Sequence, residues 1–461
     1  MVMENPAVNQ GVISTIADDL AGACDCGAEF LGISPRVTVV LHAQGDSRSA
    51  VHAPEECNAC VFNTESRDLE EHVAAQTVGA LAAQLAREGS NILLKKGDSA
   101  FRGNFAAELV AAVTAFKPGI TVVAPAIPDY GRTTVEGVQL LHGAPIADSF
   151  YREDPKQPVL QSSVLRLLQD NTPFHISHLS LSSLRSRTHA AKSEIARMNA
   201  SLSFRARGTS GHLIVADAET DDDLRSIARL FFPPAAGTTR PAQRVIFAGG
   251  QGIAKALAHV AGERDYSGQA QRLQHEPSDS RGLKPQTGPP PAAPAERRRT
   301  GHATLLVCGT LHPVSRHQTA YVAKERNIPV ISWEPGRGDT GRQVKAVCRQ
   351  IADAHLRHPA ALLLTPERSA APPAVIEREL GEIAAAVRRE IELTGLFVTG
   401  GSSAFSFLKA SGVSRLSLAT RISFGAITAY TDSGSVVCVK GGSLGSEDVM
   451  ARFLDLVAAD R

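Results

Sequence analysis

The chain has 461 residues with a formal net charge of +1; 43% of the residues are hydrophobic, 21% charged and 5% aromatic. This balance is typical of a folded globular protein, and the length predicts two or three domains of about 150 residues each. Without excess positive charge or many aromatic side chains, the composition argues against a nucleic acid or an anionic membrane as partner.

The first nine residues do not resemble a secretion signal, and the cysteines do not predict a metal site. Residues 1–9 include Glu4 and no lysine or arginine, and no stretch is apolar for long enough to span a bilayer. We therefore expect a soluble cytoplasmic protein that binds no membrane, with a homo-oligomer as a candidate assembly. The pairs Cys24/Cys26 and Cys57/Cys60 raise the question of a zinc site, but the first pair is spaced by a single residue in a predicted helix, which suits zinc poorly. We therefore expect buried, reduced thiols and no protein metal site.

Short apolar runs alternate with helical patterns in the first 262 residues, which predicts a parallel sheet covered by helices on both faces. The predicted strands are residues 12–17, 36–42, 59–63, 91–95, 121–126, 212–218 and 244–248. The predicted helices are residues 20–30, 72–88, 104–116, 221–230 and one that starts at 164–169. Residues 143–158 are expected to be rich in loops.

Residues 263–302 interrupt this alternation. They contain the proline-rich run 288–294 and three arginines at 297–299, and they lack apolar periodicity. This composition predicts a solvated linker or mobile loop. The alternation then resumes, with strands expected at 303–308, 328–332, 361–364, 395–399 and 436–439 and helices at 340–355, 373–393 and 447–458. The sequence therefore predicts an α/β protein of two domains, residues 1–262 and 303–461, with mostly parallel sheets.

Three polar segments directly follow predicted strands in the first domain. They are residues 16–22 (IADDLAG), 95–104 (KKGDSAFRGN) and 124–134 (APAIPDYGRTT). Because ligands bind beyond the carboxyl ends of parallel strands, we expect the three segments to form one site. Their carboxylates, arginines and hydroxyl groups suit a small, anionic, polyhydroxylated ligand.

Three glycine-rich turns follow strands of the second domain: residues 308–312 (CGTLH), 398–403 (VTGGSS) and 440–445 (KGGSLG). A glycine turn that leads into a helix presents free N–H groups to a phosphate. None is a Walker sequence, but three in one domain favour a nucleotide site. The turn at 249–252 (GGQG) is only a partial dinucleotide fingerprint, since it lacks the last glycine and an acidic ribose partner.

In this order the segments resemble the four-carbon acid sugar kinases, over about residues 13–458. The match departs from the family pattern at Ala21, Gly97, Thr310 and the 443–445 turn, so the substrate stays open. The resemblance implies ATP with Mg²⁺, a sugar-acid domain, a nucleotide domain and a reaction in the cleft between them. It also implies phosphorylation of the terminal (C4) hydroxyl of D-threonate, D-erythronate or 3-oxo-tetronate.

Within this resemblance each polar residue receives a candidate role. Asp19 is the candidate proton acceptor, Asp98 its rival, and Arg102 and Arg132 are expected to hold the substrate carboxylate. The remaining candidates bind substrate or nucleotide: Asp18, Ser99 and Asn104 on the sugar-acid side, and Thr310, His312, Gly400, Gly401, Ser402, Ser403 and Gly442 on the nucleotide side. Lys96 is a further candidate near phosphate.

Ordinary structural roles compete with these assignments. An aspartate at Asp18 or Asp19 also suits the cap of the following helix. Arg102 could instead form a surface ion pair with Glu108, and Arg132 could be a solvated loop residue. At the level of the whole protein, the alternatives are an NAD(P)-dependent sugar-acid oxidoreductase and a sugar-acid sensor without catalysis.

Overall fold

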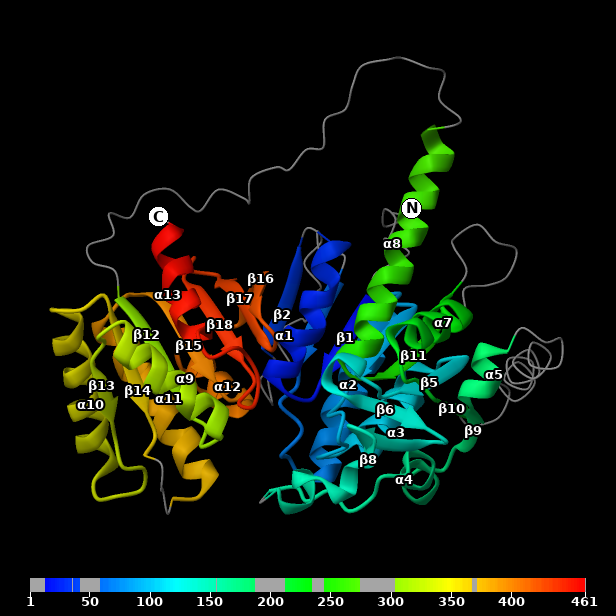
Figure 1. Ribbon diagram of the computed structural model, residues 1–461, viewed down its shortest axis with the longest axis horizontal. Helices are drawn as coiled ribbons and strands as arrows, with labels where there is room; N and C mark the ends of the chain where they lie inside the picture. The colour runs from blue at the N-terminus through cyan, green and yellow to red at the C-terminus, as the bar shows by residue number, and fades with distance from the viewer. Residues whose placement is uncertain are drawn as a thin grey trace, which may run out of the picture.

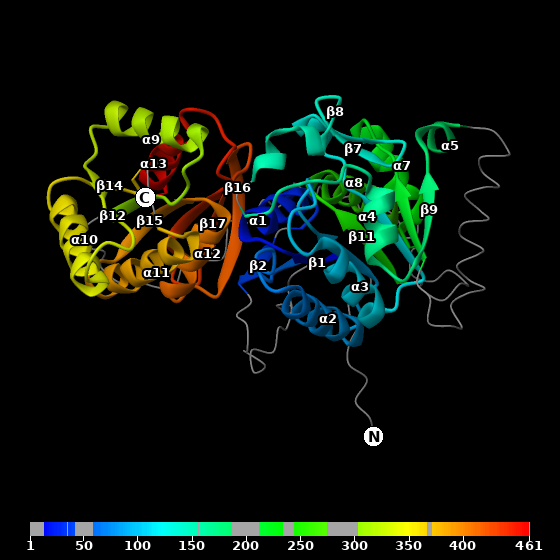
Figure 2. The same ribbon diagram turned by 90° about the horizontal axis from the view of Figure 1, so that it is seen from below.

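The computed structural model describes residues 13–34, 36–41, 59–154, 156–186, 212–233, 244–273, 303–366 and 371–460. Within these residues, one mixed sheet of 15 strands runs through both halves of the chain (Figures 1 and 2). Its strands, in spatial order, are β13 (Val330–Ser332), β14 (Ala360–Leu364), β12 (Ala303–Cys308), β15 (Leu393–Thr399), β18 (Val436–Lys440), β17 (Ala426–Thr431), β16 (Arg415–Ser423), β2 (Val37–Leu41), β3 (Ala59–Asn63), β1 (Ile13–Ala17), β4 (Ile92–Lys96), β11 (Val245–Gly249), β5 (Ile120–Ala124), β10 (His212–Ala216) and β9 (His175–Leu179).

Most neighbouring strands are parallel, as the sequence predicts, and the exceptions lie in the middle of the sheet. β16 pairs antiparallel with β17 on one side and with β2 on the other, where Leu416 lies opposite Val39. This pairing joins the two halves into one sheet. The sequence analysis did not predict β16 or β17, because residues 415–431 lack the alternation with helices that marks parallel strands.

Helices cover both faces of the sheet and shield its apolar strands. On one face a single core cluster unites helices from both halves: α1 (Leu20–Glu29), α7 (Asp221–Phe231), α8 (Gln251–Leu273), α10 (Thr340–His355), α11 (Pro373–Glu390) and α12 (Gly401–Ala410). On the other face, α2 (Glu71–Arg87), α3 (Phe105–Phe116) and α4 (Val164–Asn171) cover the first half, and α9 (Pro313–Glu325) and α13 (Val449–Ala459) cover the second. The first face therefore carries the apolar packing that holds the halves together.

A small antiparallel sheet that the sequence analysis did not predict lies just before and at the start of the expected loop-rich residues 143–158. It consists of β6 (Arg132–Val135), β7 (Val138–Leu141) and β8 (Ala144–Pro145), and the short helix α5 (Leu181–Arg185) follows β9 farther along the chain. The β6–β7 turn has two residues, Glu136 and Gly137, which both have positive φ as this tight hairpin requires. The hairpin fixes Arg132 at the start of β6.

Two further features bear on the sequence predictions. Helix α8 continues to Leu273, so residues 263–273 of the expected linker are helical, and residues 274–302 lie outside the described part of the chain (Figure 1). Cys57 also lies outside it, while Cys24, Cys26 and Cys60 are buried free thiols. Among the described helices, none combines the length and apolarity required to cross a membrane.

A buried ion pair fastens α3 to β4. Lys95 Nζ lies 2.7 Å from Glu108 Oε2, and the two side chains are 0% and 1% exposed. Ser66 donates a 2.5 Å hydrogen bond to the other oxygen of Glu108. Both charges are therefore compensated inside the protein.

We expect Glu108→Gln to lower the free energy of unfolding by about 3–5 kcal/mol, because it leaves the ammonium group of Lys95 buried without its counter-charge. Urea unfolding measures this change. Asp222→Asn is the control, because it removes a similar pair between Asp222 and Arg225 from an 84% exposed carboxylate. Equal effects of the two substitutions would show that the buried pair is no more important than a surface one.

Candidate active site

The sheet register places the three polar segments of the first half side by side. In the parallel ladder, Lys96 lies opposite both Ala17 and Gly249, and Gly249 lies opposite Ala124. The strand ends at Ala17, Lys96 and Ala124 thus lie along one edge of the sheet, and each is followed by its polar segment. The structure thus brings together the three segments that the sequence analysis expects to form one site.

Two aspartates and two cations form a tight cluster at this edge. Lys96 Nζ lies 3.2 Å from Asp18 Oδ1 and 2.8 Å from Asp19 Oδ1. Arg67 Nε lies 2.9 Å from Asp18 Oδ2, and Arg67 Nη2 lies 2.7 Å from Asp19 Oδ1. Burial opposes ionisation of Asp18, but the positive charges of Arg67 and Lys96 outweigh it and hold the Asp18 pKa well below its usual range.

Asp19 also caps α1, since the Gly22 N–H donates to its Oδ1 over 3.2 Å. The capping role that the sequence left open therefore belongs to Asp19, and it uses one carboxylate oxygen. That oxygen also accepts the bonds from Lys96 and Arg67. Lys96, considered as a phosphate ligand, instead lies buried between the two aspartates.

Asp98 is committed to Arg102. It accepts from Nε and Nη2 of Arg102, each over 2.9 Å, and from the backbone N–H groups of Ala100 and Arg102. Burial opposes ionisation, but the charges of Arg102 and Arg67 hold the Asp98 pKa well below its usual range. Arg102 also pairs with Asp154 at 2.9 Å, so its partners are these two carboxylates and not Glu108.

Arg132 reaches from the β6 hairpin into the same site. It donates hydrogen bonds to the hydroxyl oxygens of Ser99 and Tyr151, and the Tyr151 ring also lies 5.0 Å from the Arg102 guanidinium carbon. Arg132 Nε is buried and has no hydrogen-bond partner among the described residues. Buried donors usually have a partner, so this unpaired N–H group is a candidate donor to a ligand.

Asn104 stabilises the loop that carries Arg67. Its amide nitrogen donates to the carbonyl oxygens of Ser66 and Leu69 over 3.0 and 2.8 Å. These contacts give Asn104 a structural role, because they position the loop that contains Arg67. The sequence analysis missed Arg67 and Tyr151; Arg67 carried a usable signal, because it also follows a predicted strand.

The three glycine turns of the second half also converge. Cys308, Thr399 and Lys440 are register partners at the ends of β12, β15 and β18. A Cβ added at Gly442 would lie 3.0 Å from Thr310 Oγ1, and one added at Gly400 would lie 3.6 Å from Thr310 Cβ. At Gly442 a side chain would crowd Thr310, whereas at Gly400 the backbone φ of +99° and not the space favours glycine.

Buried polar side chains hold these turns in place. Lys440 Nζ donates to Ser315 Oγ and to the carbonyl oxygens of Gly441 and Leu444, over 3.1, 2.7 and 2.8 Å. Burial lowers the Lys440 pKa to about 8. His312 caps α9 by accepting from the Val314 N–H through Nδ1 over 3.2 Å. Ser403 is buried beside Gly309, while Ser402 lies in the first turn of α12.

The polar edge of the first half meets the glycine turns of the second where α1 packs against α12. A Cβ added at Gly401 would lie only 3.0 Å from Asp19 Oδ2 and 3.7 Å from Ala21 Cβ. Beside this contact, the rings of Tyr130 and Phe424 meet edge to face at 3.8 Å. The carboxylate of Asp19 therefore faces the N-terminus of α12, where free N–H groups favour an anion.

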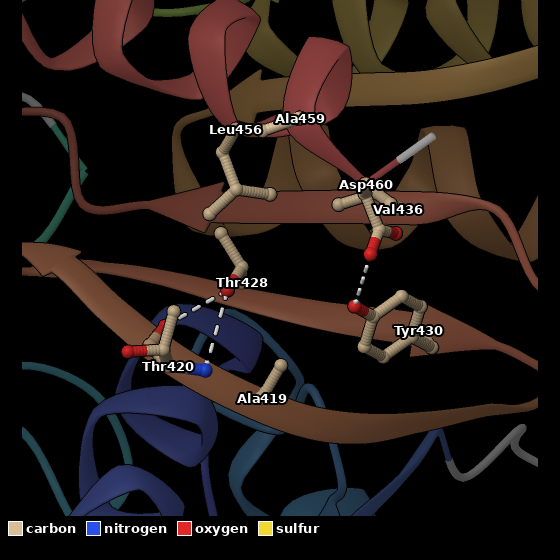
Figure 3. A pocket seen from close by; sticks show the side chains of 8 residues that line it. All are labelled: Ala419, Thr420, Thr428, Tyr430, Val436, Leu456, Ala459 and Asp460. Atoms are coloured by element: carbon tan, nitrogen blue, oxygen red, sulfur yellow. Dashed lines mark hydrogen bonds between the residues drawn. The ribbon is translucent and has the colours of Figure 1, made fainter. Parts of the chain in front are cut away.

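A separate pocket lies between β16, β17 and the end of α13 (Figure 3). Its polar contacts are internal: Tyr430 donates to Asp460 over 3.3 Å, and Thr428 donates to the Thr420 carbonyl over 3.0 Å. Its lining contains no lysine, arginine or histidine to bind a carboxylate or phosphate. The candidate site is therefore the α1–α12 junction and not this pocket.

Two family models cover most of the chain. A sugar-binding N-terminal domain matches residues 13–257, and a nucleotide-binding C-terminal domain matches residues 305–450. This chain belongs to the four-carbon acid sugar kinase family. It is accordingly a sugar acid kinase, and the two halves of the candidate site coincide with the two matched domains.

Named relatives and solved structures agree with this assignment. D-threonate kinase of Bordetella bronchiseptica is 28% identical over 97% of this chain and 98% of the relative, and D-threonate kinase of Salmonella typhimurium is 33% identical over 52% of each. A 3-oxo-tetronate kinase of Pseudomonas fluorescens is 24% identical over 99% of each. A Haemophilus influenzae protein of 17% identity shares the fold, with a TM-score of 0.64 over 96% of this chain and all of that one.

The glycines at 249–252 have a packing role in this kinase. A Cβ added at Gly249 would collide with the Ala124 carbonyl oxygen, and one at Gly252 with the Ala126 carbonyl oxygen. The turn thus allows β11 and α8 to approach β5 and the segment that follows it. This close packing explains the glycines without a dinucleotide.

The Asp98–Arg102 pair predicts a pH-dependent stability. Because folding lowers the Asp98 pKa from its ordinary 3.8, the stabilisation is complete above about pH 4 and is lost as the pH falls. We expect Asp98→Asn to lower the free energy of unfolding by about 2 kcal/mol at pH 7, with a gap to the unsubstituted enzyme that narrows below pH 4. Denaturant unfolding across pH measures it, with the exposed Asp455→Asn as control. A gap that is constant with pH would contradict this assignment.

Proposed function

We propose that this kinase transfers the γ-phosphoryl group of ATP to the terminal (C4) hydroxyl of a four-carbon sugar acid: D-threonate, D-erythronate or 3-oxo-tetronate. The observation that carries the proposal is the approach of Asp19 Oδ2 to Gly401, which brings the acidic turn of one half against the phosphate-binding turn of the other. Phosphoryl transfer requires this proximity between the acceptor hydroxyl and the γ-phosphate.

The sugar-acid carboxylate is proposed to bind between Arg102 and Arg132. Of the five N–H donors of Arg102, three bond to Asp98 and Asp154, which leaves two for a ligand. Arg132 Nε supplies another buried donor. Two rigidly held guanidinium groups favour a planar carboxylate, and the neighbouring Ser99 hydroxyl suits the hydroxyl groups of the substrate.

Asp19 is proposed to accept a hydrogen bond from the attacking hydroxyl. Lys96 and Arg67 hold Oδ1, while Oδ2 faces α12. A fixed carboxylate in this position orients the C4 oxygen toward the phosphorus atom. Asp18 supports it indirectly, by sharing the same two cations.

The nucleotide phosphates are proposed to bind to the turns that contain Thr310, Gly400 to Ser403 and Gly442, with His312 at the start of α9. Because the glycines of these turns have no side chains, the backbone N–H groups of the turns are open to phosphate oxygens. Mg²⁺ would bridge the phosphates and neutralise their charge. Among the described residues, three or more metal-ligating side chains do not cluster.

The decisive assay is ADP release with Mg²⁺-ATP and each of D-threonate, D-erythronate and 3-oxo-tetronate, with five- and six-carbon aldonates as controls. We expect turnover on a four-carbon acid, and on D-threonate first, because two D-threonate kinases are 28% identical to this chain over nearly its full length, against 24% for 3-oxo-tetronate kinases over a similar span. Phosphorylation of the longer aldonates alone would contradict the proposal. Binding of every sugar acid without ADP release would favour a sensor, and reduction of NAD(P) would favour an oxidoreductase.

We expect Asp19→Asn to lower kcat at least 100-fold while KM for the sugar acid changes less than fivefold, because the amide keeps the shape and the helix cap but loses the charge that orients the hydroxyl. Steady-state kinetics on the accepted substrate test this. Asp129→Asn is the control, since Asp129 is a 52% exposed residue near the same edge that pairs with Lys255. A kcat within threefold of the unsubstituted value would exclude Asp19 from the reaction.

A further inference from the structure

Glu65 occupies an unusual position directly beside the acidic turn. It follows β3, the neighbour of β1, and residues on both sides of it bind to the β1 end: the Thr64 N–H donates to the Ala17 carbonyl over 2.9 Å and the Arg67 N–H to the Asp18 carbonyl over 3.2 Å. Glu65 has a φ of +46°, a conformation that is uncommon for a residue other than glycine. The loop thus holds Glu65 next to Asp18 and Asp19.

The side chain of Glu65 differs from those of its neighbours in direction. Thr64 and Ser66 turn into the protein, where their hydroxyl oxygens lie 2.7 Å apart and Ser66 bonds to Glu108. Glu65 is half-buried, so that only a minor part of its surface reaches solvent, and its Oε2 accepts one hydrogen bond, from Asn63 Nδ2 over 3.0 Å. No cation lies within ion-pair distance of this carboxyl group in the described structure.

Burial and the negative charges around Glu65 favour the protonated form of its carboxyl group. Burial and then the negative charge of Asp19 raise its pKa to about 8; Asp18 acts in the same direction, while Asn63 and Arg67 offset part of the shift. The other carboxylates of the site have different surroundings: Asp18 and Asp19 share Arg67 and Lys96, and Asp98 binds Arg102 on two oxygens. A proton on any of those three would weaken an ion pair.

We propose that Glu65 is a catalytic residue of the phosphoryl transfer and the group on which the proton of the attacking hydroxyl comes to rest. This inference depends on the proposed function. Asp19 orients the hydroxyl, and Glu65 receives the proton because, among the described residues, no cation lies within ion-pair distance of its carboxylate. A group that gains and loses a proton near neutral pH is well suited to this exchange.

The O–H bond of the C4 hydroxyl breaks and its proton joins the Glu65 carboxylate. The C4 oxygen uses the freed electron pair to bond to the γ-phosphorus, and the bond from that phosphorus to the bridging oxygen breaks. ADP leaves with the electron pair, and Glu65 then releases its proton to solvent.

Glu65→Gln tests the proposal, because it keeps the size of the side chain and removes its ionisation. In the unsubstituted enzyme, kcat/KM is expected to rise with pH to a plateau with a midpoint near 8, since the base must be ionised. In Glu65→Gln we expect kcat to fall at least 100-fold and this rise to disappear. Asp25→Asn is the matched control, because burial raises the pKa of Asp25 to about 7 while Arg421 lowers it in part, so it titrates in the same range.

The outcomes separate this inference from the proposed function. A rise near pH 8 that survives in Glu65→Gln, or that disappears in Asp25→Asn, overturns the role of Glu65 and leaves the kinase intact. An unsubstituted enzyme that phosphorylates no four-carbon acid overturns the proposed function, and the role of Glu65 with it. Should Glu65→Gln fail to fold, Glu65→Asp decides: a lower kcat with the rise retained supports the proposal, and unchanged kinetics contradict it.

Discussion

The ion cluster of Asp18, Asp19, Arg67 and Lys96 is the constraint on which the site depends. Its members come from the ends of three neighbouring strands, and each cation bonds to both carboxylates. Buried charges of this kind are stable only when they are paired, so the cluster holds the three strand ends in one arrangement. It also orients the Asp19 carboxylate, because its two cations and the α1 cap all bind the same oxygen.

The second constraint is the junction between the halves. Pairing of β2 with β16 makes one sheet, and the apolar core on the α1 face continues from one half into the other. Two ion pairs span the junction: Glu29–Arg421 at 2.5 Å, and Lys156–Glu377 at 3.3 Å. An acceptor bound to one half and a donor bound to the other would therefore meet with little freedom, which is the condition for efficient transfer.

The carboxyl groups of the site differ in their surroundings more than in their chemistry. Cations surround Asp18 and Asp98, and these residues fix neighbouring side chains; Glu65 lacks a cation and favours a proton. Environments that separate the proton affinities of similar groups let one site both orient a hydroxyl and exchange its proton.

The sequence by itself determined the parallel strands, the helices between them and the polar or glycine-rich segment at each strand end, because local periodicity and turn residues specify these features. Such segments predicted most of the candidate residues, and their order identified the family. Only the tertiary structure decided that Asp98 is committed to Arg102, that Arg67 and Tyr151 join the site, and that β16 unites the halves. The reason is physical: pairing partners, burial and proton affinity depend on residues that are distant in sequence and become neighbours only in the folded chain.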